Sequence, residues 1–199
     1  MDNLKKIIES VKLNAKENLV PIVRDKTLGK LLSLSREIDA INILEIGTAT
    51  GYSGLNLLEK ENSFLTTIEK NEVRYNEAKN NFEKSGVQNR VCQILDDAQN
   101  SLEKLADEKN KFDLIFLDGP KGQYMRYLPY ITTMLRTGGV LFADNILLGG
   151  LIKDETRVNH KNRAMVKNMK KFLGEIQNSQ YYETDIFEIE DGFAICRKK

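Results

Sequence analysis

The sequence predicts an α/β protein in which helices cover both faces of a doubly wound, mostly parallel sheet. Short apolar runs alternate with amphipathic stretches along most of the 199 residues, and such alternation is typical of a parallel sheet. A glycine-rich turn follows the first apolar run, at residues 47–54, and an Asp-Gly pair separates the last two. Because ligands of such sheets bind at the carboxyl ends of the strands, we expect the functional residues there.

The predicted elements follow in a regular order. Apolar residues at helical spacing predict two helices before the first strand, one around Leu4 to Val11 and one around Leu28 to Ser35. Strand-like runs lie at residues 41–46, 64–68, 91–95, 112–117 and 139–143, and helical stretches between them at 53–59, 71–85, 98–108 and 123–135. A basic helix at 159–176 precedes runs at 181–189 and 193–197. Asp191-Gly192 joins these last runs and predicts an antiparallel hairpin, which completes a seven-stranded sheet.

Length and composition favour one domain, residues 1–199, with residues 1–38 forming N-terminal helices and a lid segment. Charged residues make up 30% and hydrophobic residues 41% of the chain, as in ordinary globular proteins. The formal charge of +1 means that a polyanionic partner would have to bind a local basic patch. No apolar run reaches membrane-spanning length, so we expect a cytoplasmic protein with no membrane association. Cys92 and Cys196 lie in strand-like runs and are predicted to be buried, reduced thiols.

The turn at residues 47–54 predicts a nucleoside site, because glycine lets the backbone approach a ligand closely. Glu69 ends the second strand-like run, where dinucleotide folds place a carboxylate on ribose hydroxyls. Glu45 precedes the turn and would repel a pyrophosphate, whereas it would attract the ammonium group of S-adenosylmethionine. We therefore favour S-adenosylmethionine over NAD. A purely structural turn is the alternative.

Two later strand ends carry oxygen donors. Asp118 follows the run at 112–117, and Asp144 and Asn145 follow the run at 139–143. Two carboxylates and an amide oxygen suit Mg²⁺, Mn²⁺ or Ca²⁺. Lys121 would lie close by, with a pKa lowered by the cation and by desolvation, and is the candidate general base. Ordinary turns at these carboxylates and a solvated lysine are the alternative.

Four segments together resemble the cation-dependent O-methyltransferases, a family that includes catechol and caffeoyl-CoA methyltransferases. They are residues 44–53, 68–69, 117–124 and 143–145. The resemblance implies a Rossmann-like class I methyltransferase fold, a metal site at Asp118, Asp144 and Asn145, and catalysis by Lys121 with Asp118. The implied cofactor-binding residues are Val20, Glu45, Gly47, Thr48, Tyr52, Ser53, Glu69, Asp97, Ala98 and Asp118.

Within this family, residues 121–124 and 191–195 look most like the bacterial tRNA 5-hydroxyuridine methyltransferases. That resemblance implies a role in tRNA modification, with wobble 5-hydroxyuridine of the anticodon loop converted to 5-methoxyuridine. A small catechol-like or caffeoyl-CoA-like acceptor is the alternative. The candidate RNA contacts are Tyr124, Arg126, Arg157 and Arg163, although Tyr124 would equally suit packing and the basic helix a solvated face. Family members are commonly dimeric, so a homodimer is expected; Ile7, Ile8 and Val11 would support the interface or cap the monomer core.

Overall fold

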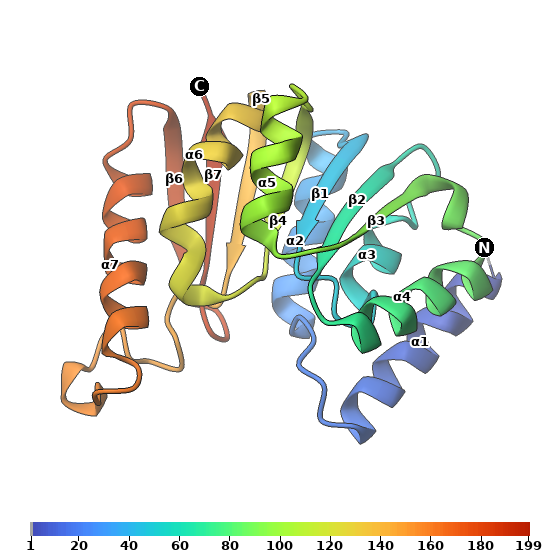
Figure 1. Cartoon of the computed structure of the whole chain (residues 1–199), viewed down its shortest axis with the longest axis horizontal. Coiled ribbons are helices and arrows are strands. Elements are labelled where there is room, and N and C mark those ends of the chain that lie inside the picture. Colours follow the sequence, from blue (N-terminus) through green and yellow to red (C-terminus); the bar gives the residue numbers. More distant parts are fainter. Residues whose placement is uncertain (1) are drawn as a thin grey trace. The chain divides into compact units, whose positions relative to one another are not determined.

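The computed structural model describes residues 2–199, which form two compact units that divide between Ser101 and Leu102. Figure 1 shows the order of helices and strands along the chain. Each unit contains part of the predicted alternation and one group of predicted site residues. Within the described residues, no helix is both long and apolar enough to cross a membrane.

The first unit contains a three-stranded parallel sheet. Its elements are α1 (Asp2–Glu17), α2 (Asp25–Glu37), β1 (Asn42–Ile46), α3 (Tyr52–Leu57), β2 (Phe64–Glu69), α4 (Glu72–Ser85), the 3₁₀ turn η1 (Gln88–Arg90) and β3 (Val91–Leu95). The strand order is β3-β2-β1, with Glu45 opposite Thr67 in the register. Helix α1 packs against α3 and α4, and Ile8 and Val11 are buried, which favours a role in the core of this unit.

Helix α5 (Ala98–Asp107) begins in the first unit and ends in the second. The other elements of the second unit are β4 (Phe112–Leu117), η2 (Lys121–Gln123), α6 (Tyr124–Met134), β5 (Leu135–Asp144), η3 (Glu155–Arg157), α7 (Arg163–Gln177), β6 (Tyr182–Phe187) and β7 (Phe193–Lys198). Their strand order is β4-β5-β7-β6. Strands β4 and β5 are parallel, whereas β7 pairs antiparallel with both β5 and β6.

Aromatic packing holds the closing hairpin against the central strands of the second unit. The ring of Phe193 stacks on Phe142 at 4.9 Å and on Phe187 at 5.0 Å, and Phe142 meets Phe116 edge-on at 5.9 Å. Such pairs contribute about 0.5–1.5 kcal/mol each beyond the burial of their area. The cluster therefore fixes the ends of β5 and β7, where Asp144 lies.

The α/β class, the seven strands and the closing antiparallel hairpin are confirmed within the described residues. Strand β5 begins at Leu135 instead of residue 139, because Leu135 already pairs with Phe112 of β4. A register shift follows this pair, and Gly138 takes a left-handed φ of 77° within it. The prediction that Cys92 is buried is wrong: it lies on β3, the end strand of the sheet, and is exposed. Cys196 is buried as predicted. A single domain stays a prediction.

Candidate active site

Glu45 is the centre of a buried hydrogen-bond network at the end of β1. Its side chain is 0% exposed and accepts hydrogen bonds from the hydroxyls of Ser53, at the start of α3, and Thr67, on β2. The Thr67 hydroxyl also lies 2.6 Å from that of Thr48. Because a buried carboxylate is costly unless it is hydrogen-bonded, these hydroxyls are what make an acid tolerable here. Glu45 thus links the residues that flank the turn to strand β2.

Residues 47–51 form the turn itself. Gly47 and Gly51 have φ values of 105° and 82°, and Ala49 also takes a left-handed φ of 47°. Gly51 caps the N-terminus of α3, and a Cβ there would approach the Phe82 ring to 3.1 Å. The predicted glycine turn is therefore present, and its backbone shape depends on glycine at these two positions.

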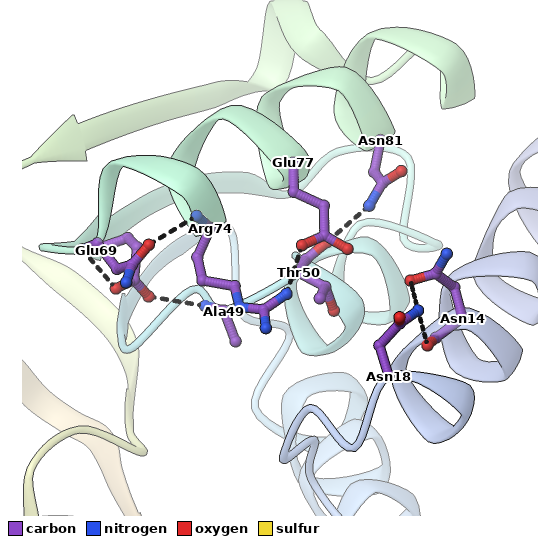
Figure 2. Close-up of polar contacts among 9 residues, drawn as sticks. Asn14, Asn18, Ala49, Thr50, Glu69, Arg74, Glu77 and Asn81 are labelled. Atoms are coloured by element: carbon purple, nitrogen blue, oxygen red, sulfur yellow. Dashed lines mark hydrogen bonds and ion pairs between the residues drawn. The ribbon is translucent and has the colours of Figure 1, made fainter.

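Glu69 holds this turn from the side, as Figure 2 shows. Its Oε2 accepts the Ala49 amide at 2.9 Å and its Oε1 accepts the Asn71 amide at 2.9 Å. The Asn71 side chain in turn caps α4 by accepting the Arg74 amide at 3.0 Å. An ionised carboxylate offers about four acceptor positions, so Glu69 retains capacity for the two hydroxyls of a ribose. The residue fits its predicted role.

The remaining predicted cofactor residues of this unit, apart from Val20, lie at the starts of helices. Tyr52 and Ser53 are the first residues of α3, and Ala98 is the first of α5. Asp97 is exposed and accepts the Gln99 amide at 2.9 Å, which caps α5. Val20 is buried in the segment between α1 and α2, where its amide donates to the Ala15 carbonyl at 2.8 Å.

In the second unit, Lys121 is tied to Asp118 and Tyr124. Its Nζ lies 2.5 Å from Asp118 Oδ1 and 3.0 Å from the Tyr124 hydroxyl. Burial lowers the pKa of Lys121, but the interactions with Tyr124 and Asp118 outweigh that effect and the pKa is raised. The predicted lowering of the Lys121 pKa depends on a cation beside it and stays a prediction. A cation on Asp118 would compete with Lys121 for the carboxylate and weaken the interaction that raises the pKa.

Tyr124 is fully buried, which supports the packing alternative for this residue over an RNA contact. Its hydroxyl lies 2.9 Å from the Leu117 carbonyl and 3.1 Å from the Asp144 carbonyl. Its ring meets Phe172 of α7 edge-on at 5.4 Å. Tyr124 therefore joins the ends of β4 and β5 and presents its oxygen to Lys121.

Asp144 is the second carboxylate of this group and is 2% exposed. Burial, and then the charge of Asp118, raise its pKa to about 7. Two carboxylates that repel each other in a buried place suit a divalent cation, which would neutralise their charge. Asn145 follows Asp144 in the chain and takes a left-handed φ of 54°. Within the described residues, no three His, Cys, Asp or Glu side chains group as metal ligands. A metal site of two carboxylates and one amide, at Asp118, Asp144 and Asn145, stays a prediction.

An open groove of about 620 Å³ lies along α7. Its lining is basic and apolar: Val158, Arg163, Val166, Lys167, Lys170 and Lys171. Of the other predicted RNA contacts, Arg126 is exposed and donates to the Gln123 side chain at 3.2 Å, and Arg157 is exposed in η3. The histidine at position 160 is exposed.

Comparison with known proteins decides the family. The family described as O-methyltransferase matches residues 1–199. The chain belongs to the O-methyltransferase family. Tapetum-specific methyltransferase 1 of Arabidopsis thaliana is 30% identical to this chain, over 93% of this chain and 80% of the Arabidopsis sequence.

Two solved structures extend this finding to the fold. A Staphylococcus aureus protein, provisionally assigned as a caffeoyl-CoA O-methyltransferase, is 34% identical with a TM-score of 0.89, over 96% of this chain and 92% of its own. A Bacillus cereus O-methyltransferase in complex with S-adenosylhomocysteine is 26% identical with a TM-score of 0.87, over 98% and 91%. The Rossmann-like methyltransferase fold and the predicted class, an S-adenosylmethionine-dependent O-methyltransferase, are confirmed.

Three polar side chains of this O-methyltransferase were not anticipated from the sequence. Asn81 of α4 donates to the Thr50 carbonyl at 2.9 Å (Figure 2), and Lys12 of α1 donates to the Asp25 carboxylate of α2 at 2.5 Å. Thr50 is 1% exposed, and its hydroxyl has no hydrogen-bond partner among the described residues. No local pattern marks Asn81 and Lys12, because their partners lie on other elements.

Proposed function

We propose that this O-methyltransferase methylates one of two adjacent ring oxygens of a small catechol-like or caffeoyl-CoA-like acceptor. The observation that carries the proposal is the carboxylate pair Asp118 and Asp144 with the Lys121 ammonium beside it. Neighbouring acceptor oxygens suit such a site, because a cation held by few protein ligands keeps positions for substrate oxygens. The assignment of the similar S. aureus protein supports the same acceptor class.

The first unit would bind the methyl donor. Glu69 would accept hydrogen bonds from the ribose, with Asp97 and Ala98 beside the adenine. The turn from Gly47, braced by Glu45 and Ser53, would hold the methionine end together with Thr48 and Tyr52, and Val20 would belong to the lid segment over the cofactor. These residues bind and orient, and orientation alone supplies a large part of the rate enhancement of a two-substrate transfer.

The second unit would bind and activate the acceptor. A divalent cation held by Asp118, Asp144 and Asn145, with Mg²⁺ as our first choice, would supply positive charge that lowers the pKa of an acceptor hydroxyl. Asp118 and Tyr124 hold Lys121 in place. With a cation on Asp118, Lys121 would lose its own proton, and the neutral amine would then take the acceptor's proton. Asp118 thus has a ligand role and a positioning role.

A second acceptor, wobble 5-hydroxyuridine of tRNA, is favoured by one observation, the basic groove along α7. Its lysines and arginine would follow backbone phosphates, and that contribution would weaken with added salt. Arg126 and Arg157 would add contacts beside it. The 5-hydroxyl and the neighbouring O4 of the base form the same pair of adjacent oxygens as a catechol. For the protein as a whole, a cytoplasmic homodimer is our prediction.

Product analysis separates the two acceptors. The enzyme is incubated with S-adenosylmethionine and Mg²⁺, and either a catechol acceptor or tRNA that carries 5-hydroxyuridine, and the products are identified by mass spectrometry. Methylated catechol without 5-methoxyuridine supports the first proposal, and the reverse result supports tRNA. A triple charge reversal, Lys167→Glu, Lys170→Glu and Lys171→Glu, is the matched variant. It should suppress tRNA methylation and leave catechol methylation intact; no product from either acceptor contradicts both.

A further inference from the structure

Helix α7 packs directly against the segment that carries Lys121. It lies alongside α6 (Figure 1) and also contacts η2, the short turn that begins at Lys121. The two backbones come close at one point, since a Cβ at Gly122 would lie 3.8 Å from the Met165 Cα. The surroundings of the candidate general base therefore include a helix that begins much later in the chain.

Asn168 of α7 makes a polar contact across this packing surface. Its side-chain amide is partly buried and donates to the Gly122 carbonyl at 3.0 Å. Gly122 directly follows Lys121, and the turn is closed by the Gln123 amide, which donates to the Pro120 carbonyl at 2.9 Å. One hydrogen bond from α7 thus holds the main chain next to Lys121.

Phe172, one turn later on the same face of α7, holds a side chain that contacts Lys121. Residues four apart in a helix lie on one face, so Phe172 and Asn168 point the same way. Phe172 meets the Tyr124 ring edge-on at 5.4 Å, and the Tyr124 hydroxyl lies 3.0 Å from Lys121 Nζ. The same face of α7 therefore contacts both the main chain beside the lysine and a partner of its ammonium group.

We propose that Asn168 is a positioning residue for methyl transfer, and that its hydrogen bond to Gly122 keeps Lys121 in place. The inference rests on the proposed role of Lys121 as general base and is independent of the acceptor. A base must lie within hydrogen-bond reach of the proton that it takes, so a small displacement of this lysine would lower turnover. A purely structural role predicts instead that Asn168 matters for stability alone.

Steady-state kinetics test the inference, with S-adenosylmethionine, Mg²⁺ and whichever acceptor product analysis identifies, a catechol or tRNA that carries 5-hydroxyuridine. Asn168→Ala should lower kcat at least about tenfold, because a misplacement of about 1 Å costs up to about 100-fold. The dissociation constant for S-adenosylhomocysteine, measured by titration calorimetry, should stay within about twofold of the wild type, because the donor is bound by other residues.

Asn178→Ala is the matched control. Asn178 also donates its side-chain amide to a glycine carbonyl, that of Gly174 at 2.8 Å, but it does so at the end of α7 and away from η2. Each variant loses one hydrogen bond of the same kind, so a purely structural role predicts similar kinetics for both. Equal kcat values for Asn168→Ala and Asn178→Ala would overturn the inference.

Lys121→Ala separates a failure of this inference from a failure of the proposed function. In the Lys121→Ala background, Asn168→Ala should lower kcat no further, because no lysine is left to position. Additive losses would show that Asn168 does not act through Lys121. If Lys121→Ala turns over like the wild type, the proposed role of the lysine is wrong. If Lys121→Ala is impaired and Asn168→Ala is not, the inference about Asn168 alone fails.

Hydrogen exchange tests the same contact without an acceptor. Asn168→Ala should speed exchange of the Gln123 amide, whose hydrogen bond to Pro120 closes the turn, and Asn178→Ala should leave that exchange unchanged. Wild-type exchange at Gln123 in the Asn168→Ala variant would contradict the positioning role.

Discussion

Lys121 Nζ lies 2.5 Å from Asp118 Oδ1, so the residue predicted as general base and a residue predicted as metal ligand form one ion pair. Both side chains are largely shielded, with exposed fractions of 20% and 24%. The pairing links acceptor activation to cation binding, because Lys121 and the cation would both interact with the Asp118 carboxylate.

Asp118→Ala should reduce kcat at least about 100-fold, because it removes a charged group where charge changes during the reaction. The chain should still unfold in one cooperative transition, since Asp118 lies outside the apolar core. Release of S-adenosylhomocysteine and thermal unfolding measure the two effects. Asp107→Asn, at the exposed end of α5, is the control and should keep wild-type turnover. Full activity of Asp118→Ala would exclude a role in the reaction.

Tyr124→Phe should destabilise the protein by about 1–3 kcal/mol, because it leaves buried polar groups at the ends of β4 and β5 without this partner. Urea unfolding at neutral pH measures the change. Tyr181→Phe removes the same hydroxyl from a residue that is 53% exposed and should change stability by less than about 0.5 kcal/mol. Equal effects of both variants would count against the buried role of Tyr124.

Gly192→Ala should destabilise the closing hairpin beside Asp144. The residue has a φ of 73°, and a Cβ there would lie 2.4 Å from Leu147 Cγ, so the change combines backbone strain with a clash and costs about 1–3 kcal/mol or more. Gly174→Ala in α7 meets nothing within 4 Å and should stabilise by about 0.5–1 kcal/mol. Thermal unfolding of the two variants should therefore shift in opposite directions, and shifts in the same direction would be contrary to this account.

The two thiols should differ in reactivity. Cys92 is exposed, whereas burial raises the pKa of Cys196 to about 12, so Cys196 is a neutral, shielded thiol at pH 8. Titration with a thiol-specific chromogenic disulfide should detect one thiol per native chain and two after denaturation. Cys92→Ser should remove the fast reaction. Rapid modification of both thiols in the native protein would show that β7 opens readily.

Sequence patterns were sufficient to predict those parts of the structure that depend on residues close together in the chain. The strand ends at Asp118 and Asp144 and the Asp-Gly hairpin are local features, and each lies where the pattern predicts it. Contacts between distant elements were not predictable. Cys92 is exposed because β3 ends the sheet, and Asn81 reaches the Thr50 carbonyl from α4. Alternation and helical spacing report the period of a segment and not its neighbour in space.

The measurement that tests the central claim most directly is the initial rate of methyl transfer from S-adenosylmethionine to the accepted substrate, after chelation and then with increasing Mg²⁺. The account predicts that chelated enzyme is inactive, that Mg²⁺ restores the rate, and that Asp144→Asn needs a higher Mg²⁺ concentration for half of its maximal rate. Full activity in the chelated enzyme, with the same rate for Asp144→Asn, would contradict a role for the Asp118–Asp144 pair in holding a catalytic cation.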